Sequence, residues 1–164
     1  MKILLATEKP FAAAAVEGIK QVVAEANHEL IILEKYTDNS QLLAAVADVD
    51  AIIIRSDKAT KEVLDAAKNL KVIVRAGAGY DNIDLSAASA NNVVAMNTPG
   101  QNSNAVAELA LGMMIMLARN NYNGSAGTEL KGKKIGIHAY GNVGKLVGQI
   151  AKGFGMEVFA LILL

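Results

Sequence analysis

The stretch KVIVRAGAGYDNID, residues 71–84, decides the fold of this 164-residue chain. It opens with an apolar, β-branched run and ends in a glycine-rich loop that carries one arginine and two aspartates. An apolar run of this kind is typical of a buried strand in a parallel sheet. Ligands bind at the carboxyl ends of strands in open α/β sheets, so the loop is also a candidate site.

Similar runs recur on both sides of this stretch. We expect strands at residues 3–6, 30–33, 51–54, 71–74, 93–96, 134–138 and 157–163. Apolar side chains at steps of three and four predict helices between them, at about residues 12–23, 42–46 and 63–67. Alternating strands and helices, with nearly continuous apolar strands, predict an α/β fold with a parallel sheet covered on both faces.

Three parts follow one another along the chain. Residues 1–98 contain five expected strands and predict a flavodoxin-like parallel sheet. Residues 99–132 contain a Pro-Gly break, a long apolar helix at about 102–119 with Asn102 to Asn104 as side-chain caps, and a linker rich in Asn and Gly. Residues 133–164 predict the first β-α-β unit of a Rossmann domain.

Composition excludes several classes of function. Sixteen basic residues balance sixteen acidic ones, so no charge surplus favours nucleic acid or an anionic membrane. There is no cysteine, which excludes disulfides, thiolate metal sites and cysteine nucleophiles, and no metal-ligand cluster is apparent. The apolar runs are shorter than the roughly 20 residues of a membrane span. We therefore expect a cytoplasmic protein without membrane or nucleic-acid partners.

The first candidate site combines the glycine-rich loop with the end of the preceding expected strand. Arg75 opens the loop, and Arg55 and Ser56 end the neighbouring strand. Arginines present planar, bidentate donors, so this pair suits a phosphorylated or carboxylated small molecule. The alternative is that Arg75 pairs with Asp81 or Asp84 and only braces the turn.

The second candidate site is the loop AYGNVG, residues 139–144, between an expected strand and an expected helix. Backbone amides at Gly141, Asn142, Val143 and Gly144 would face the pyrophosphate of a dinucleotide. Ala139 stands where the first glycine of that motif is expected, and residues 161–164 contain no carboxylate to bind the ribose. A tight strand–helix turn without a cofactor is the alternative.

Several spaced motifs together are more specific than either loop. They are Arg55-Ser56, RAGAGYDNID at 75–84, NTPGQN at 97–102, VAEL at 106–109 and GTELKGKKIGI at 127–137. With this set, the chain resembles the D-isomer-specific 2-hydroxyacid dehydrogenases, and among them the phosphoglycerate dehydrogenase type, as far as residue 159. The resemblance implies hydride transfer between C2 of a phosphorylated 2-hydroxyacid and NAD, in serine biosynthesis.

The resemblance also implies roles for individual residues. Arg55, Ser56 and Arg75 would lie near the phosphate of a substrate of the 3-phosphoglycerate class, and the backbone of Ala76 and Gly77 near its carboxylate. Ala78 would approach the nicotinamide. The pyrophosphate of NAD would lie against the four residues Gly141, Asn142, Val143 and Gly144.

No catalytic residue is assigned in this chain. In the family the catalytic Arg, Glu and His lie beyond the position of Leu164, and neither His28 nor His138 matches the catalytic histidine. We therefore expect no turnover from this chain alone. The alternative is a truncated or engineered α/β module without catalysis, which binds small anions at most. Such a module would self-associate through the helix at 102–119 or through the C-terminal strand.

Overall fold

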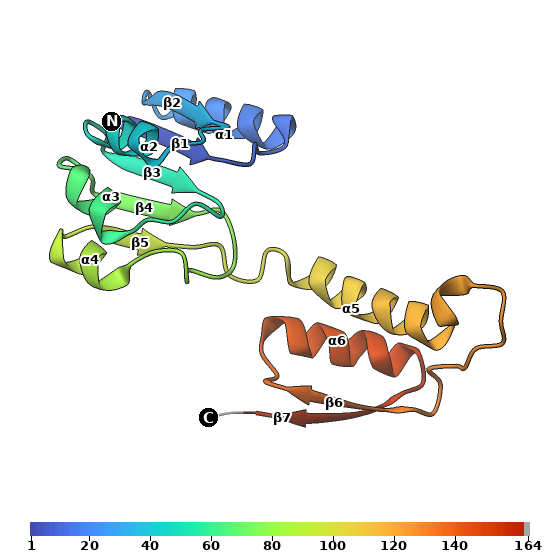
Figure 1. Cartoon of the computed structure of the whole chain (residues 1–164). Coiled ribbons are helices and arrows are strands. Elements are labelled where there is room, and N and C mark those ends of the chain that lie inside the picture. The colour runs from blue at the N-terminus through green and yellow to red at the C-terminus, as the bar shows by residue number, and fades with distance from the viewer. Residues whose placement is uncertain (163–164) are drawn as a thin grey trace. The chain divides into compact units, whose positions relative to one another are not determined.

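The computed structural model describes residues 1–162, and the chain folds into two compact units, Met1–Pro99 and Gly100–Leu164 (Figure 1). In the first unit, one parallel sheet has the strand order β2-β1-β3-β4-β5. This is the flavodoxin-like order, so the predicted fold class is confirmed. The strands are β1 (Lys2–Thr7), β2 (Glu29–Glu34), β3 (Ala51–Ile54), β4 (Val72–Arg75) and β5 (Val94–Met96).

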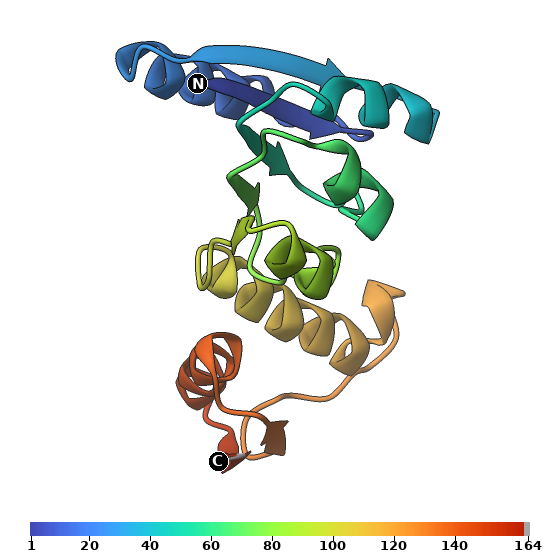
Figure 2. The same ribbon diagram turned by 90° about the vertical axis from the view of Figure 1, so that its left-hand side faces the viewer.

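Four helices connect these strands. They are α1 (Ala13–Glu25), α2 (Asn39–Val46), α3 (Lys61–Ala66) and α4 (Leu85–Ala90). Crossovers between parallel strands are right-handed, and the chain reverses direction across the sheet after β2. As a result α1 covers one face, and α2, α3 and α4 lie in a row on the other (Figure 2).

The core of the first unit lies between the sheet and the row of three helices. Leu4, Ile52 and Ile73 come from three neighbouring strands and are buried. They pack against aliphatic side chains of the helices, such as Val46 and Leu64. Burial of such a side chain contributes about 1.5–3 kcal/mol, so this cluster is a main source of stability for the first unit.

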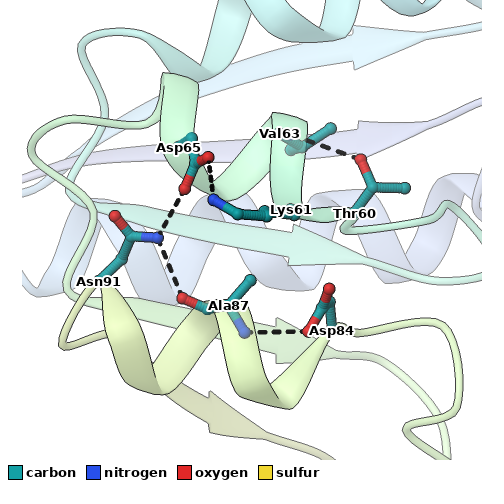
Figure 3. A network of polar contacts seen from close by, with 7 residues as sticks. All are labelled: Thr60, Lys61, Val63, Asp65, Asp84, Ala87 and Asn91. Carbon is teal, nitrogen blue, oxygen red and sulfur yellow. Dashed lines mark hydrogen bonds and ion pairs between the residues drawn. The ribbon is translucent and has the colours of Figure 1, made fainter.

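Side-chain caps begin each helix of the row. Asp38 caps α2 in a capping box with Gln41, Thr60 caps α3, and Asp84 caps α4 by accepting from Ala87 N at 2.9 Å. Figure 3 shows the last two caps. The short helix α4 was not expected from the sequence, because six residues with one leucine have no clear apolar period. The Asp84 cap was its one local signal.

The second unit consists of α5 (Ser103–Ala118), a short 3-10 helix (Asn120–Tyr122), β6 (Lys134–His138), α6 (Asn142–Gly153) and β7 (Glu157–Leu161). Strands β6 and β7 are parallel, and α5 packs against α6. Apolar side chains from α5, α6 and the strands form a separate core that includes Leu111, Val147 and Ala151.

Two details of the second unit differ from expectation. Asn102 precedes α5 but makes no capping hydrogen bond with its side chain, and Asn104 Nδ2 donates to Glu108 Oε1 at 2.6 Å instead. The last strand was expected to run to residue 163; β7 ends at Leu161, and residue 163 lies outside the described residues. No helix within residues 1–162 is long and apolar enough to cross a membrane.

Candidate functional site

Arg75 ends β4, and its side chain lies across the glycine-rich loop that follows. A β-carbon on Gly79 would lie 2.5 Å from Arg75 Nη1, and one on Gly77 would lie 3.2 Å from Arg75 Nε and Cζ. Neither Gly77 nor Gly79 has a positive φ, so the backbone conformation does not require glycine at these positions. Glycine is needed there because a side chain would collide with Arg75. Both glycines let the arginine fold over its own loop.

The hydrogen-bond and ion-pair partners of Arg75 bear on whether this arginine binds an anion or only braces the turn. Arg75 Nε donates to the carbonyl oxygen of Arg55 at 3.0 Å, and Arg75 Nη1 lies 3.8 Å from Asp81 Oδ1. The Asp81 side chain is 92 % exposed, so this long ion pair holds the guanidinium only weakly. Asp84 does not pair with Arg75, because it caps α4. Arg75 therefore contacts Asp81 only weakly and does not contact Asp84, so neither aspartate braces the turn firmly.

Arg55 and Ser56 lie at the same edge of the sheet as Arg75. In the β3–β4 register Ile54 is opposite Arg75, so Arg55 follows directly on the neighbouring strand end. Ser56 lines a groove of about 470 Å³ that reaches the loop after β4, together with Lys58, Ala59, Thr60, Asp81, Asn82, Ile83 and Asp84. Arg55, Ser56 and Arg75 thus lie at neighbouring strand ends, although neither arginine lines this groove.

The backbone of the loop is already engaged in hydrogen bonds. Ala76 N donates to Ile54 O at 2.8 Å, and Gly77 N donates to Arg75 O at 2.9 Å. Asn97 Nδ2 donates to Ala78 O at 2.8 Å, which ties the loop to the segment after β5. A substrate carboxylate at Ala76 and Gly77 would therefore share these amides with carbonyl groups, and this role remains a prediction.

A buried carboxylate beside the site was not anticipated from the sequence. Asp57 is 5 % exposed and accepts from Glu8 N and from the Tyr36 hydroxyl, each at 2.7 Å. These bonds join the ends of β1, β2 and β3. Burial, followed by the hydrogen bond and negative charge of Asp57, raises the pKa of Tyr36 well above its usual range. The sequence signal was an aspartate close behind an apolar strand.

The loop between β6 and α6 has part of the geometry of a dinucleotide site. A β-carbon on Gly144 would lie 2.4 Å from Ala139 O, so this glycine allows close packing of helix and strand. A β-carbon on Gly141 would meet nothing within 4 Å, which leaves space in front of the helix for a phosphate. These are the roles of the last two glycines in a dinucleotide-binding loop. Ala139, in the place of the first glycine, has a φ of 75°.

Asn142 and Val143 form the first turn of α6 behind Gly141, and no side chain of the described chain caps this helix. Its first amides therefore lack a side-chain acceptor, as in helix N-termini that bind anions. The carboxyl end of β7 lacks the second half of the site, because Leu161 and Ile162 are exposed apolar residues and residues 163–164 lie outside the described part. Within residues 1–162 no group of His, Asp and Glu could hold a metal ion.

Comparison with known proteins shows the family of this chain. The family model of the D-isomer specific 2-hydroxyacid dehydrogenase catalytic domain matches residues 4–153. The chain therefore belongs to the D-isomer-specific 2-hydroxyacid dehydrogenases, and its relatives include enzymes named D-3-phosphoglycerate dehydrogenase.

Three relatives illustrate the similarity. A crystal structure of NAD⁺-bound 3-phosphoglycerate dehydrogenase from Entamoeba histolytica is 48% identical with a TM-score of 0.93, covering 98% of this chain and 53% of that one. Hydroxypyruvate reductase of Thermotoga maritima is 36% identical over 146 residues, 80% of this chain and 48% of the relative. D-3-phosphoglycerate dehydrogenase of Sus scrofa is 39% identical over 143 residues, 78% of this chain and 27% of the relative. The chain thus spans at most about half of the length of these proteins.

Proposed function

We propose that this chain is the substrate-binding part, and the beginning of the NAD-binding part, of a dehydrogenase of the phosphoglycerate type. Residues 1–98 form the substrate domain, residues 99–132 the connecting helix and linker, and residues 133–164 the first unit of the cofactor domain. The observation that carries this proposal is Arg75, which lies across its own glycine loop beside Arg55 and Ser56. Relatives named for 3-phosphoglycerate support the substrate class.

Arg55, Ser56 and Arg75 bind the phosphate of the substrate in this proposal. The hydrogen bond from Arg75 Nε to Arg55 O fixes the orientation of the guanidinium, and the terminal nitrogens bind the anion. Each charge-assisted hydrogen bond to the phosphate contributes about 1.5–3 kcal/mol. In this proposal the backbone of Ala76 and Gly77, which follows the arginine in the chain, binds the carboxylate of the substrate, and Ala78 approaches the nicotinamide.

Gly141, Asn142, Val143 and Gly144 hold the pyrophosphate of NAD in this proposal, through the free space at Gly141 and the amides of the first turn of α6. When bound, NAD supplies the acceptor for the hydride from C2 of the hydroxyacid. The apolar residues Leu161 and Ile162 offer no hydrogen bond to the ribose. NAD affinity of this chain alone is therefore weak.

Turnover by this chain alone is not expected, because neither histidine matches the catalytic histidine that the family resemblance implies. His28 precedes β2 at the amino edge of the sheet, where its Nδ1 lies 3.4 Å from the terminal amine of Met1. His138 is the last residue of β6. General-base assistance contributes about 10²–10⁴-fold in rate, so a chain without a base at the substrate is catalytically deficient.

Calorimetric titration with 3-phosphoglycerate and with NAD tests this proposal. We expect the hydroxyacid to bind and Arg75→Ala to weaken it by about tenfold or more, since a charged hydrogen bond is lost. Lys20→Ala, which removes an exposed cation from α1 on the other face of the sheet (Figure 2), is the matched control. NAD-dependent oxidation of 3-phosphoglycerate by this chain in a steady-state assay would overturn the expectation of inactivity.

Self-association is the second candidate property, and the surface of α5 favours it. Leu109, Met113 and Leu117 recur at steps of four and are 62%, 52% and 71% exposed. An apolar helix face of this kind requires cover from another surface. The exposed residues Phe159 and Leu161 of β7 offer an alternative contact. Size-exclusion chromatography with light scattering should show a dimer or larger assembly that Leu109→Lys with Leu117→Lys dissociates, and a wild-type monomer contradicts this.

A further inference from the structure

The Asn82 side chain joins the two loops that carry the proposed anion site. Asn82 Nδ2 donates to Asp57 O at 2.7 Å and lies 3.4 Å from Arg55 O. The same Arg55 carbonyl accepts the hydrogen bond from Arg75 Nε at 3.0 Å. One carbonyl group therefore receives N–H groups from the asparagine and from the arginine at once.

The backbone of Asn82 strengthens this connection. Asn82 O accepts from Ala59 N at 2.9 Å, and Asp84 N donates to Ala59 O at 3.0 Å. Residues 55–59 are thereby fixed against residues 82–84 by main chain and side chain together. Ala59 and Ile83 are both buried where the two segments cross.

The orientation of the Asn82 amide follows from its neighbours. A flipped amide would place its oxygen against the carbonyls of Arg55 and Asp57, so Nδ2 must face them. Asn82 Oδ1 is then buried without a hydrogen-bond partner among residues 1–162. An unpaired buried acceptor costs free energy. The Asn82 amide therefore donates to two carbonyl oxygens while its own Oδ1 accepts no hydrogen bond.

We propose that Asn82 is a positioning residue for the anion site. It fixes the Arg55 carbonyl, and this carbonyl holds Arg75 Nε and so sets the plane of the guanidinium. Asn82 itself does not touch the anion. A small displacement of a binding group costs much of its contribution when the contact is bidentate. This inference rests on the proposed anion site after β3 and β4.

The test replaces Asn82 and measures both the orientation of Arg75 and the affinity for 3-phosphoglycerate. In Asn82→Ala, hydrogen exchange of Arg75 Hε, followed by ¹⁵N NMR, should accelerate about tenfold, the effect of losing a hydrogen bond of ordinary strength. The calorimetric dissociation constant for 3-phosphoglycerate should rise by about the same factor. Asn82→Ser keeps one donor, so its Arg75 exchange rate and its dissociation constant should lie between those of wild type and the alanine variant. If the alanine variant does not fold, the serine variant is measured in its place.

Asn91→Ala is the matched control. Asn91 Nδ2 also bonds two oxygens, Asp65 Oδ1 and Ala87 O, each at 3.0 Å, and joins α3 to α4 in the same unit (Figure 3). This variant should lose stability without altering Arg75 exchange or anion affinity. Unchanged Arg75 exchange in a folded Asn82 variant overturns the inference. If wild-type protein binds no 3-phosphoglycerate, the proposed function fails, while the exchange measurement still decides the role of Asn82.

Discussion

Arg75 Nε donates a hydrogen bond to the carbonyl oxygen of Arg55 at 3.0 Å and thereby joins the ends of β4 and β3. This bond occupies the Nε–H group of Arg75, and the terminal nitrogens lie over Gly77 and Gly79. Since the ion pair with Asp81 is long and its partner exposed, the guanidinium can exchange this contact for an anion. In our proposal the loop after β4 is therefore a preorganised anion-binding surface.

Replacement of Gly79 by alanine tests the position of Arg75. The new β-carbon would lie 2.5 Å from Arg75 Nη1 and 3.0 Å from Asp81 Oδ1, so the arginine must move. We expect affinity for 3-phosphoglycerate to fall about tenfold, by loss of a charged hydrogen bond, with little change in melting temperature. Gly18→Ala in α1, where a β-carbon meets nothing within 4 Å, should instead stabilise by about 0.5–1 kcal/mol and leave affinity unchanged. Equal affinities of both variants and wild type would refute this position of Arg75.

The two glycines of the second loop should respond differently to substitution. A β-carbon on Gly144 would lie 2.4 Å from the backbone oxygen of Ala139, and backbone cannot give way cheaply. Gly144→Ala should therefore destabilise the second unit by about 1–3 kcal/mol, the range for an overpacked site. Gly141→Ala has open space and should preserve the melting temperature while weakening NAD binding. Chemical denaturation and calorimetry measure the two effects, and loss of stability in Gly141→Ala would be the contrary result.

Ala139 offers a substitution that should increase stability. Its φ of 75° lies in a region that alanine rarely adopts, at a cost of about 1–2 kcal/mol, whereas glycine adopts it freely. Ala139→Gly should therefore raise the stability of the second unit by about 1 kcal/mol. It also restores the first glycine of the dinucleotide motif. A lower denaturation midpoint in this variant would show that the left-handed conformation is not strained.

The buried Tyr36–Asp57 pair predicts a loss of stability in alkali. The pKa of Tyr36 is raised by burial first and by the hydrogen bond to Asp57 second. A raised folded-state pKa contributes stability that is present below the unfolded value of about 10 and is lost as pH rises above it. Melting temperature should fall above about pH 10 in wild type and fall less in Tyr36→Phe. Tyr122→Phe, at a 65% exposed position, should retain the wild-type profile, and identical profiles for all three proteins would contradict the prediction.

Regular elements of this chain were predictable from the sequence because their patterns are local. Buried strands such as β1 and β3 are unbroken apolar runs, and their alternation with helices indicated a flavodoxin-like parallel sheet. Helix α4 was not predicted, because its alanines and serines show no apolar periodicity. Its stability comes instead from packing against α3 and β5.

The candidate site was predictable only in part. Arg55, Ser56 and Arg75 could be placed together because parallel strands end at one edge. Asp57 and Asn82 could not, because their roles depend on contacts with residues 49 and 25 positions away in the sequence, Glu8 and Asp57 respectively. Nor could the sequence show that Gly77 and Gly79 make room for Arg75, since this depends on the rotamer of the arginine.

An NMR titration of this chain with 3-phosphoglycerate tests the central claim most directly. Backbone amides and the Arg75 Nε–H group report on the loops after β3 and β4 separately from all other loops. We predict saturable shifts confined to residues 55–58 and 75–82 and to Arg75 Nε, abolished in Arg75→Ala. The absence of shifts at millimolar ligand, or shifts that persist in Arg75→Ala, would contradict the assignment of an anion site to this edge of the sheet.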